Sequence, residues 1–262
     1  MKKFSIASAA LCALLTASSC GTDALTFTTV AFNETSALEE GAQDSIKISM
    51  EVEYPENTGD KRSQNISAAI SATLFGSEYK DMAPQEAMKA WSDSLKAEYV
   101  SDNLELLAMM RENGEENLRP GLDWTCDKTG FAVGQFGNFL GYRTTTYMYT
   151  GGAHGGTNEV HLNFDGSSGK LLEQEDVFAD GFESEVGKLL MKHLNDGRAE
   201  DEAISLLVDE ITPNGNFSVG ENGVTFIFNQ YEIAAYAFGV IEITIPADEI
   251  KPFLKPGMNP YH

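Results

Sequence analysis

One short stretch of the chain gathers most of the residues whose side chains could do chemistry. The segment MYTGGAHGGTNEVHLNFD, residues 148–165, carries His154, Glu159 and His161. Imidazole and carboxylate groups bind divalent metals and also transfer protons. Alternation along the end of the segment places Glu159 and His161 on one face of a strand, with His154 arriving from a glycine-rich turn. These three residues are therefore weak candidates for metal ligands, and a metal-assisted hydrolase is one alternative function.

The glycines around His154 offer a simpler interpretation. Gly151, Gly152, Gly155 and Gly156 flank this histidine, and glycine permits a positive φ or a close approach of the backbone to its neighbours. On this interpretation His154 is a structural residue that hydrogen-bonds a carbonyl or a carboxylate. A zinc site needs three or four converging ligands, and the spacing supplies no further one. We therefore predict no cofactor.

A second candidate group lies in the segment FNQYEIAAYAFG. Tyrosines beside an acid suit a hydrated binding surface, because each ring combines an apolar body with a polar tip. Alternatively, Glu232 caps backbone amides and the tyrosines fill the edge of a sheet. Nucleophile elbows and zinc-protease motifs are absent from the sequence, so we predict binding without catalytic residues. The candidate ligand-binding residues are Tyr149, Gly151, Gly152, His154, Tyr231, Glu232 and Tyr236.

The composition narrows the class of partner. The chain of 262 residues has 18 Lys and Arg against 40 Asp and Glu, which gives a formal net charge of -22. Such a chain has no surplus of cations to displace counterions from phosphates, so nucleic acid is disfavoured as a partner. The same charge attracts basic proteins and divalent metals. We also expect a folded protein, because 42% of the residues are hydrophobic.

The N-terminus has the features of a targeting signal. Lys2 and Lys3 precede an apolar run over residues 4–15, and small residues then lead to Cys20. This arrangement predicts a signal peptide over residues 1–19. The sequence before Cys20 resembles a bacterial lipobox, in which the cysteine thiol is acylated. We therefore expect a protein of the bacterial cell envelope, held to the outer membrane by a lipid on Cys20 alone.

Residue patterns predict the order of strands and helices. The clearest strand is SIKISMEVEYP, residues 45–55, whose apolar residues share one face. Those residues are Ile46, Ile48, Met50, Val52 and Tyr54. Other predicted strands cover 25–35, 121–134, 139–149 and 157–165, with a later hairpin turn at 221–223 and a strand around Ile243. The first predicted helix covers 65–75 and is capped by Asn65, and the second begins at Pro84 and is broken at Ser101 and Asp102. Two more helices are predicted over 182–194 and 204–211, and a short one follows Pro246.

This order of elements predicts an α+β fold. We expect a small N-terminal domain of strands and helices, followed by an antiparallel sheet packed with helices. The predicted division of the chain is 1–19 for the signal peptide, 20–44 for the lipidated N-terminus and first strand, 45–120 for the N-terminal α+β domain, and 121–262 for the C-terminal α+β domain.

Three stretches together resemble one known family. YTGGAHGGTN, NFDGSSGKLLEQEDVF and FIFNQYEIAAYAFGVIEITIP are similar to the RsiV-like extracellular domain family. Residues 45–120 resemble the domain that accompanies it and that also occurs beside peptidoglycan deacetylases. The resemblance implies a binding module, since its best-understood members are anti-sigma factors whose outer part binds lysozyme, and others are lipoproteins of Bacteroides-like bacteria. Gln230 and Ala235 stand where the family often places prolines.

The expected function follows from the resemblance and the charge together. A lipid-anchored acidic module is expected to bind lysozyme-like muramidases, which are basic, or peptidoglycan fragments. Two alternatives stay open: the metal-assisted hydrolase that uses His154, Glu159 and His161, and a purely structural envelope lipoprotein.

Overall fold

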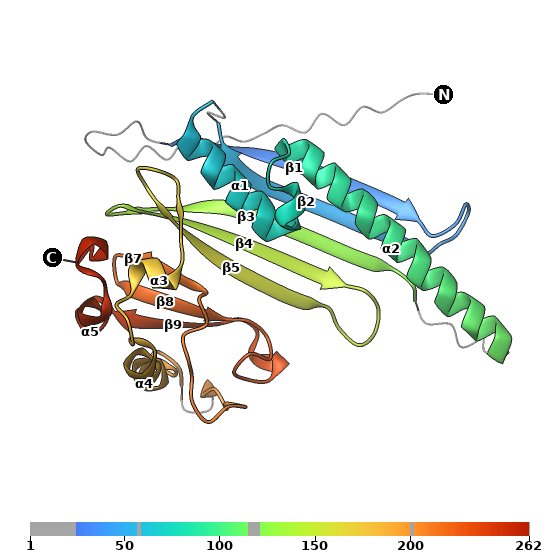
Figure 1. Cartoon of the computed structure of the whole chain (residues 1–262). Helices are drawn as coiled ribbons and strands as arrows, with labels where there is room; N and C mark the ends of the chain where they lie inside the picture. The colour runs from blue at the N-terminus through green and yellow to red at the C-terminus, as the bar shows by residue number, and fades with distance from the viewer. Residues whose placement is uncertain (1–24, 57–58, 115–120, 200–201, 262) are drawn as a thin grey trace.

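A computed structural model describes residues 25–56, 59–114, 121–199 and 202–261. The predicted signal peptide and the predicted lipidation site Cys20 lie outside these residues. The described chain forms two sheets with helices packed on them, which confirms the α+β prediction (Figure 1).

The first sheet has six strands in the spatial order β1-β2-β3-β4-β5-β6. Every neighbouring pair is antiparallel except β2 and β3, which are parallel. A parallel pair requires a crossover connection, and here α1 and α2 supply it. The strands are β1 (Phe27–Ala37), β2 (Ser45–Pro55), β3 (Trp124–Phe136), β4 (Phe139–Tyr149), β5 (Gly156–Asp165) and β6 (Leu171–Leu172).

The core of this sheet lies under the two crossover helices, α1 (Lys61–Phe75) and α2 (Pro84–Asn113). Both helices cover the same face of the sheet (Figure 1). The predicted apolar face of β2 is buried there, with Ile46, Met50 and Val52 fully inaccessible to solvent. Alternation along β2 therefore predicted its inward face correctly, because successive side chains on a strand point to opposite sides.

Both crossover helices differ in detail from the prediction. Helix α1 begins earlier than expected because Asp60, and not Asn65, is its N-cap and accepts a hydrogen bond from the backbone N–H of Ser63 at 2.9 Å. Helix α2 is continuous, so the predicted break at Ser101 and Asp102 was wrong. These two polar side chains are exposed on the outer side of the helix and do not interrupt its buried stripe.

The second sheet has three antiparallel strands in the order β7-β8-β9. A separate core that includes Phe178, Phe226 and Ile243 lies between this sheet and its helices. The elements of this part are α3 (Gln174–Val177), α4 (Glu183–His193), β7 (Phe217–Gly220), β8 (Gly223–Phe228), β9 (Ile241–Pro246) and α5 (Ala247–Ile250), with the short 3-10 turns η4 (Tyr236–Phe238), η5 (Lys251–Phe253) and η6 (Pro256–Met258). A further 3-10 turn, η1 (Ser77–Tyr79), connects α1 and α2.

The helix predicted over residues 204–211 does not form. Ile204 and Ile211 are buried in the second core, whereas Leu207 is 64% exposed. Leu206 instead makes an isolated bridge with Ala234. Apolar residues at helical spacing therefore pack here as an irregular segment, because the contact that orders them comes from a distant loop.

The two sheets meet along β5. Strand β5 contacts β7 and β8, and the second sheet lies beside it in Figure 1. The predicted domain boundary at residue 120 lies between α2 and β3, yet β2 and β3 on its two sides pair within one sheet. The first core likewise takes residues from both sides of this boundary. Among the helices of the described residues, none combines the length and the hydropathy that a membrane span requires.

Candidate functional site

A hollow of about 460 Å³ opens where the end of β4, the start of β5 and the loop after β8 meet. Its lining includes Thr146 and Met148 from β4, Thr157 from β5, and Gln230 and Tyr231 from the loop. The described residues that line it include no Asp, Glu, Lys or Arg. Since the whole chain has a net charge of -22, this uncharged lining sets the hollow apart from the bulk of the surface.

His154 forms one wall of the hollow and is exposed. Its ring stacks on the ring of Tyr236, with centroids 3.9 Å apart and planes at 24°. The Nδ1 atom of His154 lies 3.1 Å from the carbonyl oxygen of Gly155, and the hydroxyl of Tyr236 donates to the same oxygen at 2.9 Å. One carbonyl therefore holds both rings in place, so the aromatic surface is ordered before any ligand arrives.

The glycines around His154 serve the backbone, as predicted. Gly151 and Gly152 have φ values of 99° and 85°, in the left-handed region that favours glycine. A Cβ atom on Gly155 would lie 2.5 Å from the hydroxyl of Tyr147, so any larger residue at this position would displace the ring of Tyr147. Gly156 shows neither feature.

Tyr231 stands at the mouth of the hollow in a strained conformation. Among the described residues it is the only non-glycine residue with a positive φ, at 69°. Its side chain is 60% exposed, and its ring centroid lies 5.7 Å from that of Tyr236. A bulky residue in the left-handed region costs about 1 kcal/mol or more, and such strain concentrates at functional positions.

The structure brings together only part of the predicted binding set. His154, Tyr231 and Tyr236 share the hollow. The hydroxyl of Tyr149 donates to the carbonyl of Gly152 at 3.1 Å, outside the lining. Glu232 lines a neighbouring hollow of about 480 Å³, where its carboxylate accepts a hydrogen bond from the side chain of Asn214 at 2.9 Å. The predicted residues that do not line the first hollow are Tyr149, Gly151, Gly152 and Glu232.

A second site is buried along β5, where Glu159 and His161 lie together as predicted. The Nε2 atom of His161 is 2.8 Å from Oε1 of Glu159, and Arg143 on β4 donates to Oε2 of the same carboxylate. Burial acts to raise the pKa of Glu159, but His161 and Arg143 outweigh it, so the pKa lies below its ordinary value. The Nδ1 atom of His161 and the Nε atom of Arg143 are buried without a hydrogen-bond partner among the described residues.

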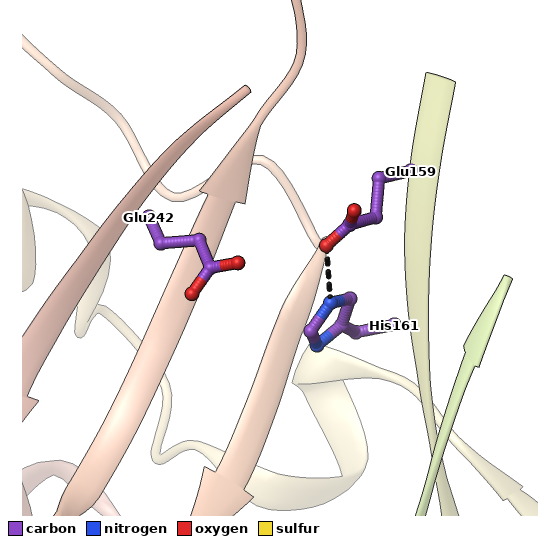
Figure 2. Close-up of side chains that lie close together, drawn as sticks. All are labelled: Glu159, His161 and Glu242. Atoms are coloured by element: carbon purple, nitrogen blue, oxygen red, sulfur yellow. Dashed lines mark hydrogen bonds and ion pairs between the residues drawn. The ribbon is translucent and has the colours of Figure 1, made fainter. Parts of the chain in front are cut away.

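Glu242 on β9 joins Glu159 and His161 from the opposite sheet (Figure 2). One ligand atom from each of the three residues lies within 4.8 Å of the other two. His154 does not belong to this group, because its ring lies against Tyr236. The predicted trio is therefore only partly assembled, and Glu242 takes the third place.

Amide side chains from the segments that flank β7 and β8 cover the free edge of β5. Beyond its short pairing with β6, this edge presents backbone groups that another strand would otherwise satisfy. Three backbone N–H groups of β5 donate hydrogen bonds to side-chain amide oxygens. Thr157 donates to Gln230 at 2.8 Å, Glu159 to Asn229 at 2.7 Å, and His161 to Asn216 at 2.8 Å.

Asn163 makes the most deeply buried of these connections. Its side chain is 1% exposed. Its Nδ2 group donates to the carbonyl of Phe217 at 2.7 Å, and its Oδ1 accepts from the backbone N–H of Val219 at 3.1 Å. The amide thus serves β7 as a strand neighbour would. The polar face of β5 is therefore the joint between the two sheets.

In the comparisons with known proteins, a family model matches the part of the chain that holds the second sheet, and two solved structures match nearly the whole chain. Residues 175–248 match the family model "Protein of unknown function (DUF3298)". The chain is similar to the crystal structure of a DUF3298 family member from Bacteroides fragilis NCTC 9343, with a TM-score of 0.80 and 26% identity over 90% of this chain and 95% of that one. A DUF3298 protein from Pseudomonas aeruginosa PAO1 shares the fold, with a TM-score of 0.66 and 17% identity over 92% of this chain and 99% of that one. No curated protein matches.

The segment that matches the DUF3298 model, called the DUF3298 segment below, includes α4 and β7 to β9. It contains Glu242 and Tyr231, whereas His154, Glu159 and His161 precede it. The finer RsiV-like assignment stays a prediction.

Sequence reasoning missed Arg143, Asn216, Asn229 and Glu242. Arg143 pairs with His161 in the β4–β5 register, which places it diagonally across from Glu159, and only that register reveals the Arg143–Glu159 contact. The asparagines do carry a weak signal, since each stands at a strand end, where a polar amide often bonds to backbone groups.

Proposed function

We propose that this protein is a lipid-anchored binding module of the bacterial cell envelope whose ligand is the sugar chain of peptidoglycan fragments. The observation that carries the proposal is the aromatic surface in an uncharged hollow, where the rings of His154 and Tyr236 stack and the ring of Tyr231 lies tilted beside them. On this proposal the protein binds without catalysis. The envelope location and the lipid on Cys20 rest on the N-terminal sequence.

The chemistry of the hollow suits a neutral sugar. Aromatic rings offer apolar faces to the C–H surfaces of a sugar ring, while hydroxyl and amide groups at the rim bond to its hydroxyls. Thr150 and Asn158 supply such rim groups. The hydrogen bonds that hold Tyr236 and Gln230 reduce the entropy lost on binding, because these side chains are already ordered.

Titration with soluble peptidoglycan fragments tests this proposal. Calorimetry should detect binding to the wild type, and Tyr231→Ala should weaken the affinity at least about tenfold, as expected for an aromatic contact of about 1.4 kcal/mol. Phe131→Ala is the matched control, because Phe131 is another exposed aromatic residue, 40% accessible, and does not line the hollow. Equal affinities for the wild type and Tyr231→Ala would refute the assignment.

A basic muramidase is a second candidate ligand, favoured by the net charge of -22 and by the resemblance to lysozyme-binding ectodomains. Binding of lysozyme should then persist at about 0.15 M salt, where the screening length is about 8 Å. Affinity that vanishes at this salt concentration would reflect non-specific charge attraction only.

The anchor is tested separately. Labelled palmitate should be incorporated into the wild type and not into Cys20→Ala, and label in both proteins would exclude Cys20 as the acylated residue.

A further inference from the structure

We propose that Glu159, His161 and Glu242 form a binding site for a divalent transition-metal cation, with Zn²⁺ as the best match. This site is separate from the aromatic hollow and does not depend on the sugar-binding proposal. The three side chains converge from the two sheets, Glu159 and His161 from β5 and Glu242 from β9 (Figure 2).

The spacing of the ligand atoms is close to what a zinc ion needs. Tetrahedral ligands at bond lengths of about 2.1 Å lie about 3.4 Å apart. The Nε2 atom of His161 and Oε1 of Glu159 are 2.8 Å apart, and an atom of Glu242 lies within 4.8 Å of both residues. Glu242 is exposed, so its side chain can move the remaining distance by a change of rotamer. The cation then replaces the hydrogen bond between His161 and Glu159; Nε2 of His161 binds the cation without a proton, and the imidazole carries its remaining proton on Nδ1.

The chemistry of the ligands selects the class of cation. One imidazole nitrogen with two carboxylates suits zinc and its first-row neighbours, whereas Mg²⁺ and Ca²⁺ prefer oxygen ligands alone. The two carboxylates and the guanidinium of Arg143 together carry a formal charge of -1, so a divalent cation is electrostatically favoured. Three protein ligands leave a fourth position for water on the side of exposed Glu242.

The buried part of the site is already organised. The side chains of Glu159 and His161 are 3% and 10% exposed, so neither rotates freely. Arg143 bonds to the oxygen of Glu159 that does not face His161, which orients the carboxylate in the way that outer-shell partners of metal ligands do. A cation bound here would fasten β9 of the DUF3298 segment to β5 of the first sheet.

Calorimetry on the full chain without an affinity tag tests the site. We expect one Zn²⁺ per chain, with weaker binding of Mg²⁺ and Ca²⁺. Glu242→Gln removes one ligand and should lower the Zn²⁺ affinity at least about tenfold. Glu221→Gln is the matched control, because Glu221 is an exposed acid in the β7–β8 turn outside the cluster, and it should leave the affinity unchanged.

Two further measurements keep the test decisive. His161→Ala risks unfolding because His161 is largely buried, so the main comparison uses Glu242→Gln, at an exposed residue. The circular dichroism spectrum of Glu242→Gln should match that of the wild type. Zn²⁺ should also raise the unfolding temperature of the wild type more than that of Glu242→Gln. Equal Zn²⁺ affinity in the wild type and Glu242→Gln, or Mg²⁺ binding as tight as Zn²⁺ binding, would overturn the proposal.

Discussion

The two histidines of residues 148–165 have opposite surroundings. His154 is exposed and stacks on Tyr236 beside an open hollow. His161 is 10% exposed and bonds to Glu159 in the joint between the two sheets. The same residue type on one short segment thus lies open to solvent beside a hollow at one end and is held by buried hydrogen bonds at the other, and burial makes this difference.

Because of this difference, substitutions near His161 and substitutions near His154 should affect different properties, the first mainly stability and the second mainly ligand binding. A buried polar group that loses its partner costs about 1–3 kcal/mol, because water cannot replace the lost hydrogen bond. Exposed side chains contribute little to the free energy of unfolding, since water solvates whatever remains after substitution. Variants in the joint should therefore unfold easily, and variants in the hollow should fold normally but bind weakly.

The largest effect is expected for Asn163→Ala. The substitution leaves the carbonyl of Phe217 and the N–H of Val219 without their partner, so the free energy of unfolding should fall by about 3 kcal/mol. Urea unfolding measures this change. Asn158 is an exposed asparagine on the same strand, and Asn158→Ala should change the free energy of unfolding by less than about 0.5 kcal/mol. Similar losses in both variants would break the contrast between the joint and the surface.

A smaller loss is expected for Glu159→Gln. The amide keeps the shape of the side chain but removes the charge that pairs with Arg143 and His161. We expect the free energy of unfolding to fall by about 2 kcal/mol. This is less than the loss for a fully buried ion pair, because Arg143 is 36% exposed. Chemical unfolding without added metal provides the measurement, and Glu242→Gln, on the exposed side of the cluster, should lose less than about 0.5 kcal/mol.

The turn that ends β5 should add a modest dependence of stability on pH. Burial acts to raise the pKa of Asp165, but hydrogen bonds from Ser168, Asn138 and Ser167 lower it below 3.8 on balance. The folded state therefore favours the charged form of Asp165. Its contribution to the free energy of unfolding is complete above about pH 4 and is lost as the pH falls through the pKa that Asp165 has in the folded protein. Asp165→Asn should remove this part of the dependence, less than about 1 kcal/mol because the group is partly exposed. The difference in the free energy of unfolding between the wild type and Asp165→Asn should be larger at pH 6 than at pH 2.5. An equal difference at both pH values would contradict the prediction.

The smallest change in stability is expected for Tyr231→Asn. Asparagine tolerates the left-handed conformation better than tyrosine, so the unfolding free energy should stay within about 0.5 kcal/mol of the wild type. Sugar affinity should nevertheless fall at least about tenfold, because the exposed ring is lost. Parallel calorimetry and thermal unfolding separate the two effects. A variant that binds normally but unfolds early would reverse the roles that we assign to the hollow and the joint.

Much of the fold could be predicted from local patterns. The buried face of β2, the meander β3-β4-β5 and the hairpin β7-β8 follow from alternation and turn residues. The failures lie where local rules compete. Asp60 and Asn65 are both good caps, and only the packing of α1 selects Asp60, while Asn65 donates to the carbonyl of Ser168 at 3.0 Å. Residues 204–211 have helical spacing, but a bridge to Ala234 orders them differently.

For the candidate sites, local sequence patterns were enough to predict which residues share a strand face and which glycines allow an unusual backbone conformation. Alternation placed Glu159 and His161 on one face of a strand, and the glycines near His154 were identified as backbone positions, because strand periodicity and glycine stereochemistry are local properties. What covers that strand face could not be predicted in this way. The second sheet buries it, brings Glu242 toward His161 and leaves His154 in the open, because these contacts depend on how segments distant in the chain pack together.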